Sequence, residues 1–108
     1  MSKESVVPLH LTTAVAEQRI HRIAQDTSSV KLTFHAKQQM ADRDISITDM
    51  YRILRTGQVE TTPKLTERGN WKCKMTHALR GRRTAGVVVA LTNDSKLVVI
   101  TVEWEDGK

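Results

Sequence analysis

Two histidines stand at positions where a proton-transfer group would be useful. His35 follows an alternating apolar segment and opens a short helical segment, so its ring would lie near helical N–H groups that lack partners. His77 ends a basic segment, beside Lys74 and Arg80. Imidazole titrates near neutral pH and serves as a general acid or base. Both residues also have structural interpretations, His35 as a helix cap or packing residue and His77 as a solvated turn residue, and the residues alone leave these open.

The positive charge of the chain is concentrated in one segment. Seven basic residues and a single acid, Glu67, lie between Lys64 and Arg83, whereas the whole chain carries a formal charge of +5. Alternation places Lys72 and Lys74 on the same face of a strand, with Trp71 on the opposite face. Such a basic strip is typical of a surface that binds a phosphate backbone, although solvated lysines and arginines also decorate many sheet faces. The candidate nucleic-acid-binding residues are Lys72, Lys74, Arg80, Arg82 and Arg83.

Three helices are predicted in the first half of the chain. Thr12 or Thr13 can cap a helix over residues 14–25. A second, short helix begins at His35 or Ala36 and runs to about Arg43, with Ala36 and Met40 facing inward. Ser46 and Asp49 have the spacing of a capping box, which begins a third helix over residues 47–55. Gly57 stands where a C-terminal cap belongs. The third helix is predicted to bury Ile47, Met50, Ile53 and Leu54.

The strands are predicted from alternation of apolar and polar residues. Val30, Leu32 and Phe34 share one face of a short first strand, and Pro63 marks residues 59–65 as an edge strand. Further strands are expected over residues 71–76, 84–91 and 97–104. The predicted fold class is α+β, with N-terminal helices packed on a small antiparallel sheet of about four strands. Residues 1–108 form a single domain, in which 1–29 are an N-terminal extension with a helix and 30–104 are the core.

Length and composition restrict the remaining possibilities. A chain of 108 residues with 39% hydrophobic and 27% charged residues is globular and holds one core. Its single cysteine, Cys73, rules out an intramolecular disulfide, and Cys73 with His77 is too small a set for a structural zinc site. No cofactor motif, secretory signal or membrane-spanning segment is found, so we expect no metal, no cofactor and a cytoplasmic location.

One motif resembles a known family. Leu32 to Ala36, followed by Met40, Arg43 and Ile45-Ser46, is similar to the opening motif of domain of unknown function family 4258, and residues 97–104 fit its ending. Gln39 departs from the family pattern, which has Arg there, and Asp44 stands where Gly is common. The resemblance implies a RelE/ParE toxin-like fold. It also implies a domain directed at nucleic acid.

Three hypotheses on function follow. The first is a RelE-like RNA-binding protein, or a metal-independent endoribonuclease in which His35 and His77 are the acid–base candidates and Arg43 orients His35 or binds phosphate. The second is a non-catalytic interaction module whose basic strip docks an acidic, antitoxin-like protein. The third is a structural accessory domain, because a fold does not imply a function. The oligomeric state is left open.

Overall fold

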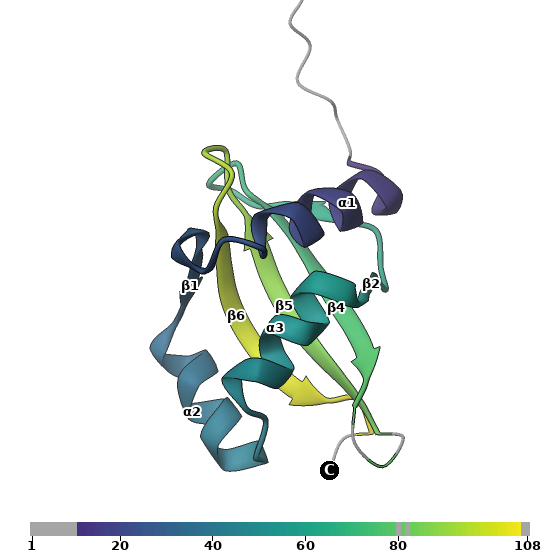
Figure 1. Cartoon of the computed structure of the whole chain (residues 1–108). Helices are drawn as coiled ribbons and strands as arrows, with labels where there is room; N and C mark the ends of the chain where they lie inside the picture. Colours follow the sequence, from purple (N-terminus) through teal and green to yellow (C-terminus); the bar gives the residue numbers. More distant parts are fainter. Residues whose placement is uncertain (1–10, 80, 82, 107–108) are drawn as a thin grey trace, which may run out of the picture.

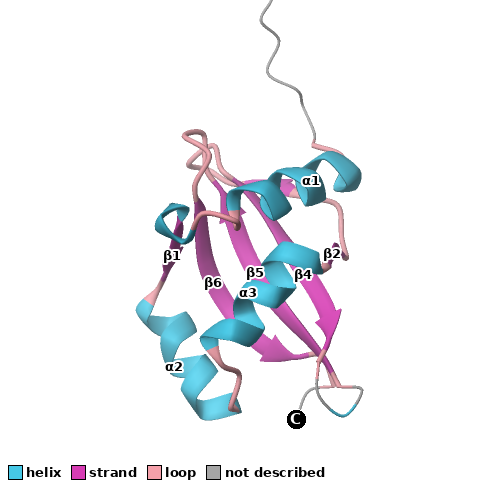
Figure 2. Cartoon of the chain, in the orientation of Figure 1, coloured by secondary structure: helices cyan, strands magenta, loops and turns pink. Residues whose placement is uncertain are grey.

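Two of the three helices cross one face of a curved sheet, and the third lies beside its edge (Figures 1 and 2). The computed structural model describes residues 11–79, 81 and 83–106. In chain order, the helical part comprises α1 (Thr13–Ile23), a short 3-10 turn (Thr27–Ser29), α2 (Phe34–Arg43) and α3 (Ile47–Thr56). The strands are β1 (Val30–Leu32), β2 (Gln58–Val59), β3 (Lys64–Leu65), β4 (Trp71–Ala78), β5 (Thr84–Leu91) and β6 (Leu97–Trp104). Helices α1 and α3 cross the near face of β4, β5 and β6 (Figures 1 and 2). This arrangement confirms the α+β class and the packing of helices on a sheet.

The sheet is mixed rather than wholly antiparallel. Its strands follow the order β1-β6-β5-β4-β2, and β3 also pairs with β4. Strand β1 runs parallel to β6, whereas β2, β3 and β5 are antiparallel to β4. The predicted edge strand over residues 59–65 is two separate short strands, with the buried Pro63 between them. The difference arises because alternation identifies a strand but not its direction or its partner.

Phe34 corrects the predicted first strand. Alternation placed its side chain on the inner face with Val30 and Leu32, but α2 begins at Phe34, whose side chain is 75% exposed. Thr33 decides this, because its side-chain oxygen accepts a hydrogen bond from the backbone N–H of Ala36 at 3.1 Å and so starts the helix. His35 consequently lies in the first turn of α2, as the sequence predicted.

The capping box of α3 is confirmed. The Ser46 hydroxyl accepts from the backbone N–H of Asp49 at 3.0 Å, and the Asp49 carboxylate accepts from the backbone N–H of Ser46 at 3.1 Å. Met50, Ile53 and Leu54 are fully buried. Ile47, predicted to be buried with them, is 54% exposed, because it is the first residue of the helix, although its spacing fits the buried stripe.

Helix α1 belongs to the same core as the rest of the chain. Ala16, Ile20 and Ala24 have no exposed surface, and they pack in one continuous cluster with the buried residues of α3 and the sheet. Thr12 caps this helix through the N–H of Val15. The described part of the segment predicted as an N-terminal extension, residues 11–29, therefore contributes to the hydrophobic core.

Gly57 lies where the end of α3 approaches the sheet too closely for a side chain. Its backbone φ is −77°, so it is needed for space rather than for a left-handed conformation. A Cβ at this position would lie 2.5 Å from the carbonyl oxygen of Ile53 and 2.6 Å from that of Thr76. The carbonyl of Gly57 also accepts a hydrogen bond from Nε2 of His21 at 2.6 Å. Helices α1 and α3 and strand β4 thus meet at one residue without a side chain.

Helix α2 covers the part of β6 that β1 does not reach. Beyond the pairing of Leu32 with Val99, the backbone N–H of Val102 donates to Oε1 of Gln39 at 2.9 Å. The indole Nε1 of Trp104 donates to the carbonyl of Arg43 at 2.9 Å. Gln39, which departs from the family pattern, therefore satisfies an N–H of a strand edge.

None of the helices in the described ranges is long and apolar enough to cross a bilayer.

We expect Gly57→Ala to lower the free energy of unfolding by about 3 kcal/mol or more, because both atoms that the methyl group meets are backbone oxygens that cannot move aside. Gly69→Ala is the control, since Gly69 has φ +83° and a Cβ added there would meet only Asn93 Nδ2 within 4 Å, at 3.7 Å. Its cost is that of a left-handed backbone alone, about 1–2 kcal/mol. Urea titrations measure both, and equal losses would contradict the steric explanation.

Stability should also fall at alkaline pH because of Cys73. Burial against the helices disfavours the thiolate and raises the pKa of this thiol from 9.0 to about 11. The unfolded chain therefore releases the proton first as the pH rises, which favours unfolding between these values. At pH 10.5 the wild type should lose about 2 kcal/mol relative to pH 8 from this group. In urea titrations, the free energy of unfolding of Cys73→Ala should fall by about 2 kcal/mol less than that of the wild type between pH 8 and pH 10.5. The same pH dependence in both proteins would refute a contribution from the Cys73 thiol.

Candidate nucleic-acid interface

The face of the sheet opposite the helices carries the lysines of the basic strip. Alternation along β4 directs the buried Cys73 and Met75 toward the helices, so Lys72 and Lys74 point to the other face. In the register of β3 and β4, Lys64 lies directly opposite Lys72. We call Lys64, Lys72 and Lys74 the lysine face. The structure thus confirms that Lys72 and Lys74 share a side, and it adds Lys64 to them.

Lys64 and Lys72 are exposed cations that are not engaged in an ion pair with any described residue. Within the described residues, neither ammonium pairs with a carboxylate. Directly opposed side chains in an antiparallel pair have Cβ atoms about 4.5–5.5 Å apart, a spacing at which like charges repel. With Lys74, they line a shallow hollow that also contains Thr61, Thr62 and Val88. Three lysines and two threonines therefore border this hollow, where an anion would be stabilised.

Lys74 is already neutralised by two carboxylates. Its Nζ lies 2.8 Å from Oε2 of Glu105 and 3.2 Å from Oε2 of Glu103, and these side chains are only partly exposed. Burial by itself lowers the pKa of Lys74, but the contacts with the two glutamates outweigh this effect and raise the pKa above its usual value. The pair lies directly over Gly86, where a Cβ would collide with both Glu105 and Lys74. Lys74 therefore contributes little free positive charge to the lysine face.

Arg83 is also held within the chain. Its guanidinium donates two hydrogen bonds to the Asp106 carboxylate, at 3.0 and 3.1 Å, and lies 4.0 Å from the centroid of the Trp104 ring. It lines a surface hollow together with Arg43, so the structure brings these two predicted residues to one place. Arg80 and Arg82, the other two predicted phosphate-binding residues, lie outside the described residues. The basic strip is consequently less positive than its sequence indicates.

The three candidate catalytic residues do not share a site. His35 and Arg43 lie near opposite ends of α2, eight residues or about 12 Å apart along the helix axis. His77 is on β4, separated by β5 from the strand on which α2 packs. Its Nδ1 lies 2.7 Å from the carbonyl oxygen of Ala78, and it borders a hollow with Thr56 and Gly57. His77 thus points to the same face of the sheet as Cys73 and Met75, away from the lysine face. Neither His35 nor His77 lies next to Arg43 in the described part of the chain.

Comparison with known protein families identifies the class. Residues 32–104 match Domain of unknown function (DUF4258), and the chain belongs to this family. The match confirms the resemblance carried by His35, Met40 and Arg43, and it begins after α1. No curated protein and no solved structure matches the chain. The relation to the RelE and ParE toxins therefore stays a prediction.

Sequence reasoning missed two features of this surface. Lys64 was counted in the basic strip but not among the binding residues, because only the β3–β4 register places it opposite Lys72. The acidic partners Glu103 and Glu105 come from the last strand and the residue after it, about 30 positions from Lys74. The sequence offered one signal for them. Glu103 and Glu105 stand two residues apart on either side of the apolar Trp104, so alternation places both side chains on the same face of the strand, opposite to Trp104.

We expect Lys74→Met to lower the free energy of unfolding by about 1–3 kcal/mol, because it leaves the partly buried Glu105 carboxylate without its cation. Met keeps most of the apolar stem, so the loss reports the charge. Lys72→Met is the matched control on the same face of the same strand, and it should change stability by less than about 0.5 kcal/mol. Equal effects in urea titrations would show that the ion pair has no stabilising role.

Proposed function

We propose that this chain is an RNA-binding domain that holds the phosphate backbone at Lys64 and Lys72, in the cytoplasm. The observation that carries the proposal is the direct opposition of these two lysines on the helix-free face of the sheet, with no described carboxylate to neutralise them. Mutual repulsion makes the site more favourable when an anion lies between the ammonium groups. Thr61 and Thr62 supply hydroxyl donors at the same hollow.

The proposal concerns binding and not cleavage. Acid–base cleavage of RNA needs proton-transfer groups and a phosphate-stabilising cation around one scissile bond. His35, His77 and Arg43 lie at three separate places, and neither histidine borders the Lys64–Lys72 hollow. Recognition through phosphates without base stacking also suits this face, because Trp71 points to the opposite side of the sheet from Lys72.

A second candidate is a module that docks an acidic, antitoxin-like protein on the same face. The observation that favours it is the neutralisation of Lys74 and Arg83 by Glu103, Glu105 and Asp106. The cationic area left among the described residues is small, and a few carboxylates of a protein partner would match it. The two candidates share their residues and differ in the partner.

The test is RNA binding by Lys64→Glu/Lys72→Glu as a function of salt. For single-stranded RNA of mixed sequence at low salt, we expect affinity about tenfold or more below wild type, and a slope of log K against log salt shallower by about 1.4, since each lost phosphate contact contributes about 0.7. Lys37→Glu/Arg52→Glu is the charge-matched control, because both residues are exposed on helices away from this face.

Three outcomes decide between the candidates. Equal loss in the two double variants would show that only net charge matters and would overturn the site. Absence of wild-type binding to RNA at low salt would overturn RNA as the partner. If polyglutamate then bound the wild type but not Lys64→Glu/Lys72→Glu, the acidic-protein candidate would take its place.

A further inference from the structure

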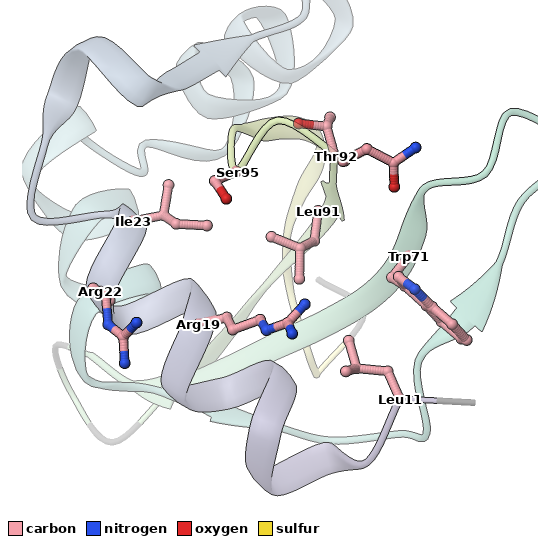
Figure 3. A pocket seen from close by; sticks show the side chains of 9 residues that line it. Leu11, Arg19, Arg22, Ile23, Trp71, Leu91, Thr92 and Ser95 are labelled. Atoms are coloured by element: carbon pink, nitrogen blue, oxygen red, sulfur yellow. The ribbon is translucent and has the colours of Figure 1, made fainter. Parts of the chain in front are cut away.

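Another hollow lies on the helix side of the molecule, away from the lysine face. It is enclosed by α1, by the beginning of β4 and by the turn that joins β5 to β6 (Figure 3). Leu91 is part of its apolar floor, and Trp71 and Arg19 lie across it from each other, the Arg19 side chain extending from α1 over the opening. Since the family match begins at residue 32, the helical wall of this hollow is a feature of the segment outside the family core.

The charge of this hollow is positive and not neutralised. Arg19 and Arg22 stand one helical turn apart on the exposed side of α1, and both border the hollow. No carboxylate in the described ranges forms an ion pair with either guanidinium. Because both side chains are exposed, they are free to turn toward a common anion. Each guanidinium group donates through a planar fork of N–H groups that matches phosphate oxygens.

The opposite wall offers a flat apolar surface and free polar groups. The Trp71 ring is partly buried against the core and borders the hollow. Asn93 and Ser95 contribute side chains for which the described residues provide no hydrogen-bond partner, whereas the Thr92 hydroxyl is already engaged with Asp94 and Lys96. An indole face stacks on a planar heterocycle, and an amide side chain both donates to and accepts from the edge of a base.

We propose that this hollow binds a nucleoside monophosphate unit. Its phosphate lies between Arg19 and Arg22, and its base packs against Trp71 with its polar edge toward Asn93. The unit is either a free nucleotide or the 5′-phosphorylated end of a strand, because both present the same phosphate and base. The site does not rest on phosphate binding at Lys64 and Lys72, which face the other side of the sheet.

The two tryptophans provide a site-specific readout. In an assigned ¹⁵N–¹H spectrum of the full chain, adenosine 5′-monophosphate should shift the indole resonance of Trp71. The resonance of Trp104, whose Nε1 is bonded to the carbonyl of Arg43, should stay in place. Adenosine and ribose 5-phosphate, each lacking one half of the ligand, should bind at least tenfold more weakly. A shift of Trp104 alone, or equal binding of ribose 5-phosphate, would overturn the proposal.

Charge reversal separates this site from general attraction. Arg19→Glu/Arg22→Glu should lower the affinity for adenosine 5′-monophosphate at least tenfold. Arg52 is an exposed arginine on α3, and Arg52→Glu should leave this affinity within twofold of the wild type. Unchanged affinity in the first variant would refute the phosphate position. Nucleotide binding should persist in Lys64→Glu/Lys72→Glu. The nucleotide site and the proposed RNA-binding site at Lys64 and Lys72 are therefore tested independently of each other.

An oligonucleotide then identifies the source of the ligand. If a 5′-phosphorylated strand displaces the nucleotide better than the same strand without the phosphate, the hollow holds a strand end. If the two strands compete equally poorly, the ligand is the free nucleotide. Displacement by the unphosphorylated strand alone would contradict the proposed role of Arg19 and Arg22.

Discussion

The close backbone contact at Gly57 is the constraint on which the arrangement of the helices depends. At this residue α3 ends against β4, with the carbonyl oxygens of Ile53 and Thr76 too near for any side chain. The carbonyl of Gly57 also accepts a hydrogen bond from the His21 imidazole, and two residues further on the Glu17 carboxylate accepts one from the N–H of Val59 at 2.9 Å. Side chains of α1 thus form hydrogen bonds with the backbone of Gly57 and Val59, where the chain passes from α3 to β2. The buried Ile20 of α1 and Ile53 of α3 belong to the same hydrophobic core, so the polar contacts set the position and the apolar contacts supply most of the stability.

Local signals in the sequence were sufficient for most elements. The Ser46–Asp49 capping box and the alternation from Trp71 to Thr76 predicted α3 and β4 because each depends on neighbours within a few residues. Phe34 continues the alternation of β1 but is the first residue of α2, and its side chain is exposed. Ile47 is the first residue of α3 and is exposed although its spacing fits the buried stripe of that helix. The parallel pairing of β1 with β6 and the split of residues 59–65 depend on contacts between distant segments, which periodicity does not encode.

The candidate sites show the same division between local and distant information. Alternation correctly placed Lys72 and Lys74 on one side, yet their charges differ in availability because Glu103 and Glu105 return to Lys74 from the far end of the chain. The concentration of positive charge in the sequence is therefore greater than on the surface that the structure describes. The hollow beside Arg19 gave no signal at all, since its walls come from α1, β4 and the β5–β6 turn and meet only after folding.

The pairing of β1 with β6 has a consequence for the order of events during synthesis. Leu32 and Val99 are partners separated by more than 60 residues, and β6 lies inside the sheet, between β1 and β5. On a chain that grows from its N-terminus, β1 and α2 emerge long before the strand against which both of them pack. Contacts of this range form late, because a long loop must close before they contribute. The N-terminal half is thus an incomplete surface until the last strand arrives, and exposed Val30 and Met40 would be substrates for a holding chaperone in that interval.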